Sequence, residues 1–286
     1  MDEAIEIGGA KYLFSKKAFH GLLNWLFIGV LSFISVVLLY QLAVGSVSCA
    51  LGYETHIRFG KVDSFPQFNR CWSGTRVLAL YAIPSLLLVL FSVFILIALL
   101  FAPKGNINRR WIAFWTMIVS ALLGTTLMSI SLISALSVNG SLFQGFAVVT
   151  RWFGLSLYWS IGFLILSGVI NIAFGFLCSE VLLNLAPPDF IIRDEKNSPR
   201  AVVLNTFVYP MLILFPVAIV LSYPGHLSFF VVMLFHACLW LPGLFNISET
   251  SLRKRRSRGK NVTLHSNYLL CGLALVLIIV VRLFFS

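Results

Sequence analysis

Seven apolar runs, each free of Asp, Glu, Lys and Arg, alternate along the chain with short polar segments. Each run comes close to or exceeds the roughly 20 residues that a helix needs to cross the hydrocarbon core of a bilayer. The runs cover residues 19–48, 78–102, 111–137, 152–178, 201–222, 225–245 and 264–281. The pattern predicts an all-α polytopic membrane protein with about seven transmembrane helices, organised as an N-terminal tail (1–18) and a single transmembrane domain (19–286).

The polar segment 49–77 differs from the others because part of it alternates with a period of two. In "YETHIRFGKVDSF", the residues Tyr53, Thr55, Ile57 and Phe59 alternate with Glu54, His56, Arg58 and Gly60. This period is typical of a β-strand, and a strand alone in lipid leaves its backbone groups unpaired. We therefore expect this strand to pair with another strand or to lie at the interface, as a β-like re-entrant or interfacial segment.

The composition excludes a water-soluble globule. Of the 286 residues, 59% are hydrophobic and 11% are charged, whereas soluble domains carry about 25% charged residues. The net charge of +11 would suggest nucleic acid in a soluble protein, but here the basic residues lie between apolar runs, where they set the topology. We therefore expect the lipid bilayer, and not nucleic acid, as the partner of this charge.

The distribution of Lys and Arg predicts the orientation in the membrane. With the N-terminus inside, 15 of the 21 basic residues fall on inner segments, as the positive-inside rule requires. The C-terminus is then outside. The exception is the segment 49–77, whose four basic residues would lie on the outer side unless the segment enters the membrane.

A basic cluster stands before the last run, in "SLRKRRSRGK" (251–260). On an inner loop it would meet anionic lipid headgroups, and each basic residue near the surface adds about 1 kcal/mol to that attraction. The residues concerned are Arg253, Lys254, Arg255, Arg256, Arg258 and Lys260.

Four uncharged polar residues stand inside the runs as candidates for a polar cavity: Asn24, Asn171, Asn205 and His236. The simpler role of each is an interhelical hydrogen bond, because a buried amide or imidazole in lipid needs a partner. Prolines such as Pro84 and Pro210 bend their helices, and broken helices line substrate sites in some transporters. In the run 111–137, the small residues favour close helix approach and predict a central packing helix.

Cys49 and Cys71 flank the β-like segment. They would pair if that segment faces an oxidising compartment, and the sequence leaves this open.

The stretch "ALGYETHIRFGKV" (50–62), followed by "TRVLALYAIPSLLLVL" (75–90), resembles the site-2 protease group of intramembrane metallopeptidases. In that group a helix carrying His-Glu-x-x-His leads through a short turn into a membrane-associated β segment and then into a Gly-Pro-containing helix. Here Ile83-Pro84 stands in place of Gly-Pro. A later metal-ligating Asp of the group is echoed by Asp189 in "LLNLAPPDF" (182–190). The resemblance covers about 60 residues.

The chain differs from this group at the positions of the metal ligands and the catalytic base. The usual offset from the turn places the motif on "YQLAV", so that Tyr40 and Val44 replace the two His ligands and Gln41 replaces the Glu base. A hydrolytic zinc site needs such ligands and a carboxylate base. We therefore predict no catalytic residues, no metal site and no cofactor, and describe Tyr40, Gln41, Val44 and Asp189 as degenerate motif positions.

The predicted function is a non-catalytic, site-2-protease-like scaffold or partner-binding subunit of a membrane complex, a pseudoenzyme of the bacterial inner (cytoplasmic) membrane. A small-solute or lipid-handling permease that uses the proline-broken helices is the competing class. An active intramembrane zinc metallopeptidase is disfavoured by the missing ligands.

Overall fold

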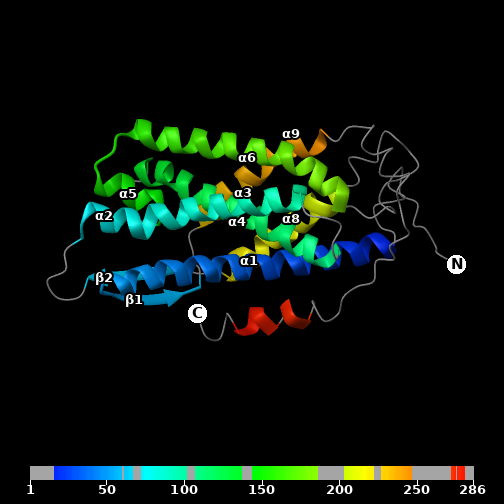
Figure 1. The fold of residues 1–286 in the computed structure, drawn as a ribbon, viewed down its shortest axis with the longest axis horizontal. Helices are drawn as coiled ribbons and strands as arrows, with labels where there is room; N and C mark the ends of the chain where they lie inside the picture. The colour runs from blue at the N-terminus through cyan, green and yellow to red at the C-terminus, as the bar shows by residue number, and fades with distance from the viewer. Residues whose placement is uncertain are drawn as a thin grey trace.

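The structure is a computed structural model, and it describes residues 16–59, 61–66, 72–101, 107–136, 144–185, 203–221, 227–246, 272–274 and 276–280. Within these ranges, six helical segments are long and apolar enough to cross a bilayer. The expectation of a helical, polytopic membrane protein is confirmed to this extent. The long helices run roughly parallel to one another, as Figure 1 shows.

The elements occur in a simple order along the chain. They are α1 (Lys16–Ala50), β1 (Tyr53–Arg58), β2 (Lys61–Pro66), α2 (Gly74–Val77), the π-helical η1 (Leu78–Ala82), α3 (Ile83–Phe101), α4 (Ile107–Leu136), α5 (Phe146–Trp152), α6 (Leu157–Leu185), the π-helical η3 (Leu204–Val208), α8 (Tyr209–Leu221) and α9 (Leu227–Phe245). The elements α2, η1 and α3 join into one candidate span, and so do η3 and α8.

A proline follows each of the two π-helical turns after one intervening residue, Pro84 after η1 and Pro210 after η3. Proline has no amide hydrogen, so the carbonyl four residues before it loses its usual donor. A π-helical turn shifts the hydrogen-bond register locally at such a point. The helices therefore continue past these prolines, and Pro216 and Pro242 likewise lie inside α8 and α9.

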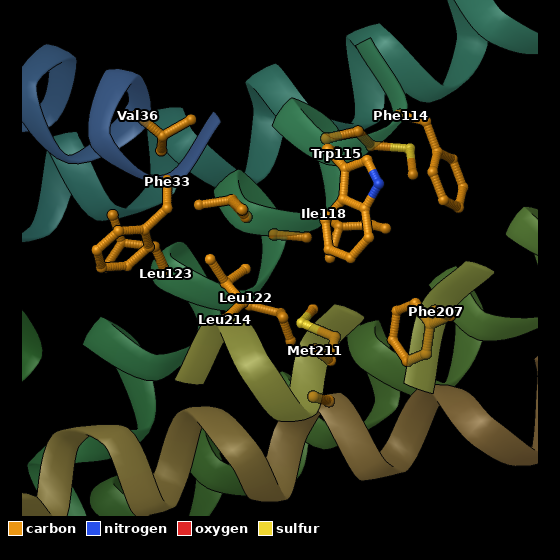
Figure 2. Close-up of a cluster of buried hydrophobic side chains, with 14 of the residues drawn as sticks. Phe33, Val36, Phe114, Trp115, Ile118, Leu122, Leu123, Phe207, Met211 and Leu214 are labelled. Carbon is orange, nitrogen blue, oxygen red and sulfur yellow. The ribbon is translucent and has the colours of Figure 1, made fainter. Parts of the chain in front are cut away.

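The helix α4 occupies the centre, and the prediction of a central packing helix is confirmed. In its most apolar stretch of 18 residues, 83% of the residues are buried, a larger share than in any other candidate span in the described residues. It contacts α1, α3, α5, α6 and α9. In Figure 2, side chains of α4, among them Trp115, Ile118 and Leu122, meet Phe33 of α1 and Met211 of α8 in the main buried cluster.

The predicted fourth run, 152–178, differs from the helix that forms. Residues 146–152 make a separate short helix, α5, and the span α6 begins only at Leu157 and continues to Leu185. The break occurs at Gly154, whose φ of 60° is left-handed. The amide of Leu155 donates to the carbonyl of Thr150 at 2.8 Å, the 6→1 bond of a helix ending with glycine. An apolar run continues through such a turn, so hydrophobicity alone does not detect it.

Several predictions of organisation concern residues outside the described ranges. Residues 272–274 and 276–280 of the seventh run are helical, and Ala274 is buried in the main cluster, but the count of seven spans stays a prediction. The division into a tail and one domain is untested. Asp189, Cys71 and the basic cluster 253–260 lie outside the described residues.

A β-hairpin follows α1 and folds back along it. The helix ends in a turn at Gly52, whose φ is 75° and whose amide donates to the carbonyl of Cys49 at 2.9 Å. The strands β1 and β2 pair antiparallel, with Tyr53 opposite Pro66 and Arg58 opposite Lys61. Figure 1 shows both strands running beside α1. Residues 74–77, expected in the same polar segment, instead begin the next helix.

Candidate functional site

The three positions on α1 that the sequence resemblance singles out, Tyr40, Gln41 and Val44, lie in a packed environment. Val44 is 4% exposed and forms a small buried cluster with Tyr53 of β1 and Leu80 of η1. Gln41 is 1% exposed. The Tyr40 phenol lies next to Ser85, whose hydroxyl donates to the carbonyl of Tyr81 at 2.9 Å. Where a zinc site would need imidazoles, this chain therefore has a phenol and an aliphatic side chain, both engaged in packing.

Aromatic rings lie beside the same positions. The ring of Tyr53 lies 4.8 Å from that of Trp72, and Trp72 lies 6.2 Å from Tyr81, measured between centroids. The guanidinium of Arg76 lies 5.9 Å from the centre of the Tyr53 ring, within the range of a cation–π contact. These residues join the end of α1 to the start of the second span through packing. Among the described residues, no group of three His, Cys, Asp or Glu is placed to hold a metal ion.

Asn171, on α6, holds three helices together. Its amide nitrogen donates to Thr125 Oγ1 of α4 at 3.0 Å and to the carbonyl of Ser167 at 2.8 Å. Its amide oxygen accepts a hydrogen bond from the indole nitrogen of Trp240, on α9, at 2.7 Å. Because Asn171 and Trp240 are fully buried, both ends of the amide are satisfied inside the bundle. The interpretation as an interhelical hydrogen bond is confirmed for this residue.

His236 forms a second polar group one turn away on α9. Its Nε2 lies 3.1 Å from Ser129 Oγ, and its Nδ1 lies 3.4 Å from Thr126 Oγ1, both on α4. The Ser129 hydroxyl also donates to the carbonyl of Thr125 at 3.0 Å. Each of these side chains is at most 1% exposed. The imidazole of His236 on α9 therefore contacts two side chains of α4, which is again an interhelical contact.

The other two candidate cavity residues lie elsewhere. Asn24 is half-buried near the start of α1, and Asn205 is buried in η3. The hydrogen bonds described above join neither of them to His236. The structure thus brings together two of the four predicted residues, and a polar cavity beside them stays a prediction.

The sequence did not predict the hydrogen-bond partners of Asn171 and His236. The sequence marks Ser129 only as a small packing residue, whereas Thr125, Thr126 and Trp240 carry no signal in it. Gly175 and Gly243 were also missed. A Cβ on Gly243 would lie 2.2 Å from the amide nitrogen of Phe176, and one on Gly175 would lie 2.5 Å from the carbonyl oxygen of Trp240. The backbones of α6 and α9 therefore touch directly beside the Asn171–Trp240 bond.

The hairpin is held to α1 by a row of side chains. Thr55 Oγ1 donates to Ser48 Oγ at 2.7 Å, and Ile57 fills the space over Gly45, where an added Cβ would lie 2.8 Å from the Ile57 Cδ1. The ring centroids of Phe59 and Phe33 are 6.3 Å apart. On the alternate positions, His56 Nε2 lies 3.4 Å from Glu54 Oε1, and both side chains are exposed. Among the described residues, Cys49 forms no disulfide, and its pairing with Cys71, which lies outside them, stays a prediction.

No family of proteins, no curated protein and no solved structure was found to match this chain. The site is therefore interpreted from its own geometry.

Proposed function

We propose that this chain is a non-catalytic relative of the site-2 proteases that binds a partner protein within a bacterial inner membrane. Two features support it. The positions Tyr40, Gln41 and Val44 lack the ligands and base of a metallopeptidase, and their side chains pack into the protein. The β-hairpin beside α1 offers the surface on which a partner would dock.

The reach of the hairpin along α1 is the observation that carries the proposal. Phe59, at the turn between the strands, contacts Phe33, which lies about 25 Å along α1 from Ala50 at the rise of an α-helix. The candidate span of α1 covers Leu23–Ala50, and the hydrocarbon core is about 30 Å thick. A hairpin that reaches Phe33 therefore extends to about the middle of the membrane, which supports a re-entrant position.

A two-stranded sheet in the hydrocarbon region needs a further strand to pair the backbone groups at its edges. In the described residues, β1 pairs with β2 and the sheet has no further member. The outer backbone groups of a strand need hydrogen-bond partners, and hydrocarbon supplies none. An extended segment of another protein that adds to the sheet would supply them along its whole length. This mode of binding uses backbone groups, so it requires no catalytic residue in this chain.

Photo-crosslinking in native membranes tests the docking surface. A photoreactive phenylalanine analogue at Glu54, an exposed position of β1, is expected to yield one discrete protein adduct. The control places the analogue at Phe94 of α3, which is 69% exposed on a lipid-facing helix and is expected to label lipid. Absence of a protein adduct at Glu54, or the same adducts at both positions, would contradict the proposal.

Metal analysis tests the loss of catalysis. We expect purified protein to hold far less than one zinc ion per chain, because Tyr40 and Val44 offer no imidazole and Gln41 offers no carboxylate. The measurement is elemental analysis after dialysis against zinc and then against buffer. A stoichiometric amount that survives the second dialysis would restore the metallopeptidase hypothesis.

A small-solute or lipid-handling permease is the second candidate. The feature that favours it is the pair of π-helical turns, η1 and η3, at Pro84 and Pro210, since interrupted helices often line transport sites. Asn205 lies within η3. Reaction of a cysteine at this position with a small water-soluble thiol reagent would favour transport, and protection from the reagent would favour the partner-binding role.

A further inference from the structure

A hollow of about 420 Å³ opens on the first turns of α6, beside the short helix α5. It is lined by Tyr158, Trp159, Gly162, Phe163 and Leu166. Its floor is firm because the ring of Phe163 packs edge-to-face on Phe146 of α5, with centroids 4.7 Å apart. Above Gly162 there is open space, since a Cβ placed there meets no atom within 4 Å. The hollow is open on its outer side, and all of its lining residues belong to α6.

The hollow faces outward from the bundle, toward the lipid. It lies on α6, which is the least buried candidate span in the described residues. In the most apolar stretch of 18 residues of α6, 28% of the residues are buried. The rims are exposed, with Tyr158 at 83% and Leu166 at 48%. Tyr158 and Trp159 stand at the beginning of the span, where such residues mark the level of the lipid headgroups. The hollow therefore runs from the headgroup level into the hydrocarbon region.

The lining selects a single apolar chain over a neighbouring helix. Close helix approach in membranes is favoured by small residues spaced four apart on one face. Here the residues four before and four after Gly162 are Tyr158 and Leu166, and both are large and exposed. They would hold a helix backbone away from Gly162, whereas one hydrocarbon chain can lie between them. An unfilled space of this kind would forfeit dispersion contacts along its walls.

A positive charge lies close to the headgroup end. Arg151 is exposed at the last turn of α5, and its Nη2 donates to the carbonyl of Ser134 near the end of α4 at 2.9 Å. This bond fixes the guanidinium at the same end of the bundle as Tyr158. Exposed Trp152 stands beside it on α5. A lipid phosphate would be attracted to this position, because arginine binds phosphate in a defined geometry.

We propose that the hollow over Gly162 is a binding site for a phospholipid, with one acyl chain between Tyr158 and Leu166 and the phosphate at Arg151. The lipid would cover the junction of α5 and α6, which is the point where the predicted fourth span is interrupted. This site is separate from the hairpin, so the lipid-binding proposal does not depend on the partner-binding role.

Filling the hollow tests the proposal. Gly162→Leu places a side chain in the open space and is expected to lower the retention of phosphatidylglycerol by about tenfold, which corresponds to the loss of roughly two buried methylene groups. The matched control is Gly272→Leu, also in a helical segment and also with nothing within 4 Å of its Cβ. It is expected to retain phosphatidylglycerol as the wild type does. Retention is measured by native mass spectrometry of full-length protein released from vesicles of phosphatidylglycerol and phosphatidylcholine.

A second measurement on the wild type does not depend on the folding of any variant. Phosphatidylglycerol with a photoreactive group in its acyl chain is incorporated into the same vesicles, and the labelled peptide is identified. Label concentrated on residues 158–166 supports the proposal. Label spread evenly over the exposed faces of α3 and α6, equal retention by Gly162→Leu and the wild type, or stronger labelling by a free fatty acid carrying the same group would each overturn it.

Discussion

Replacement of Gly243 by alanine is expected to lower the free energy of unfolding by about 3 kcal/mol, the upper end of the usual cost of overpacking. The new methyl group would lie 2.2 Å from the amide nitrogen of Phe176 and 2.3 Å from the carbonyl carbon of Gly175. Both are backbone atoms of α6, so no side chain can rotate away to make room. The two helices must separate, and the indole bond from Trp240 to Asn171 would be strained as they do so.

The measurement is unfolding of the purified protein in detergent micelles by titration with a denaturing detergent. The control is Gly272→Ala, where the added methyl group meets nothing within 4 Å. This change is expected to leave stability unchanged or to raise it by up to about 1 kcal/mol, because alanine is the better helix former. Equal stability of the Gly243→Ala variant and the wild type would show that α6 and α9 do not touch at this point.

Replacement of Asn171 by leucine is expected to lower the free energy of unfolding by about 2 kcal/mol. The change leaves the Trp240 indole N–H without its acceptor and removes the donor to Thr125, and an unsatisfied buried polar group costs about 1–3 kcal/mol. The same denaturation measurement applies. Ser179→Ala is the matched control on the same helix, because its hydroxyl donates to the carbonyl of Phe176 within that helix, at an exposed position.

A double-mutant cycle with Trp240→Phe separates the hydrogen bond from general packing. The single Trp240→Phe change and the single Asn171→Leu change each break the same bond, so the double variant should lose less stability than the sum of the two. We expect a coupling energy of about 1 kcal/mol, the size found for side-chain hydrogen bonds between membrane helices. Additive losses would mean that the two side chains do not share a hydrogen bond.

The hairpin and the polar network have different consequences for function. Asn171 and His236 bind α4, α6 and α9 into one packed unit, which gives these polar residues a structural role. The hairpin instead places strands beside α1 with exposed polar positions at Glu54 and His56. A strand surface of this kind is suited to pairing with an extended segment of another chain.

How far the sequence predicted this molecule depends on the range of the interactions. A helix in lipid makes all of its backbone hydrogen bonds within its own segment. An apolar run such as 111–137 therefore predicts α4 without information from any other part of the chain. The break at Gly154 was missed because the run remains apolar through the turn. The strand over 53–58 was visible as a period of two, but its partner, Lys61–Pro66, has no comparable alternation.

The candidate site divides in the same way. The absence of metal ligands at Tyr40 and Val44 is a matter of residue type and could be stated from the sequence. The pairing of Asn171 with Trp240 could not, because the two residues stand on helices far apart in the chain, whose close approach at Gly175 and Gly243 depends on tertiary packing. Many residues in other runs are able to accept or donate the same hydrogen bonds.

The sequence by itself determined that this chain lives in a bilayer, where its helices begin and end to within a few residues at most termini, and which chemistry its first helix lacks. Those properties follow from local composition and from hydrogen bonds made within one helix. The tertiary structure decided which polar side chains meet, how deep the hairpin lies along α1, and where α5 and α6 leave a hollow. These depend on how helices pack against one another, and packing is set by the shapes of surfaces that are far apart in the chain.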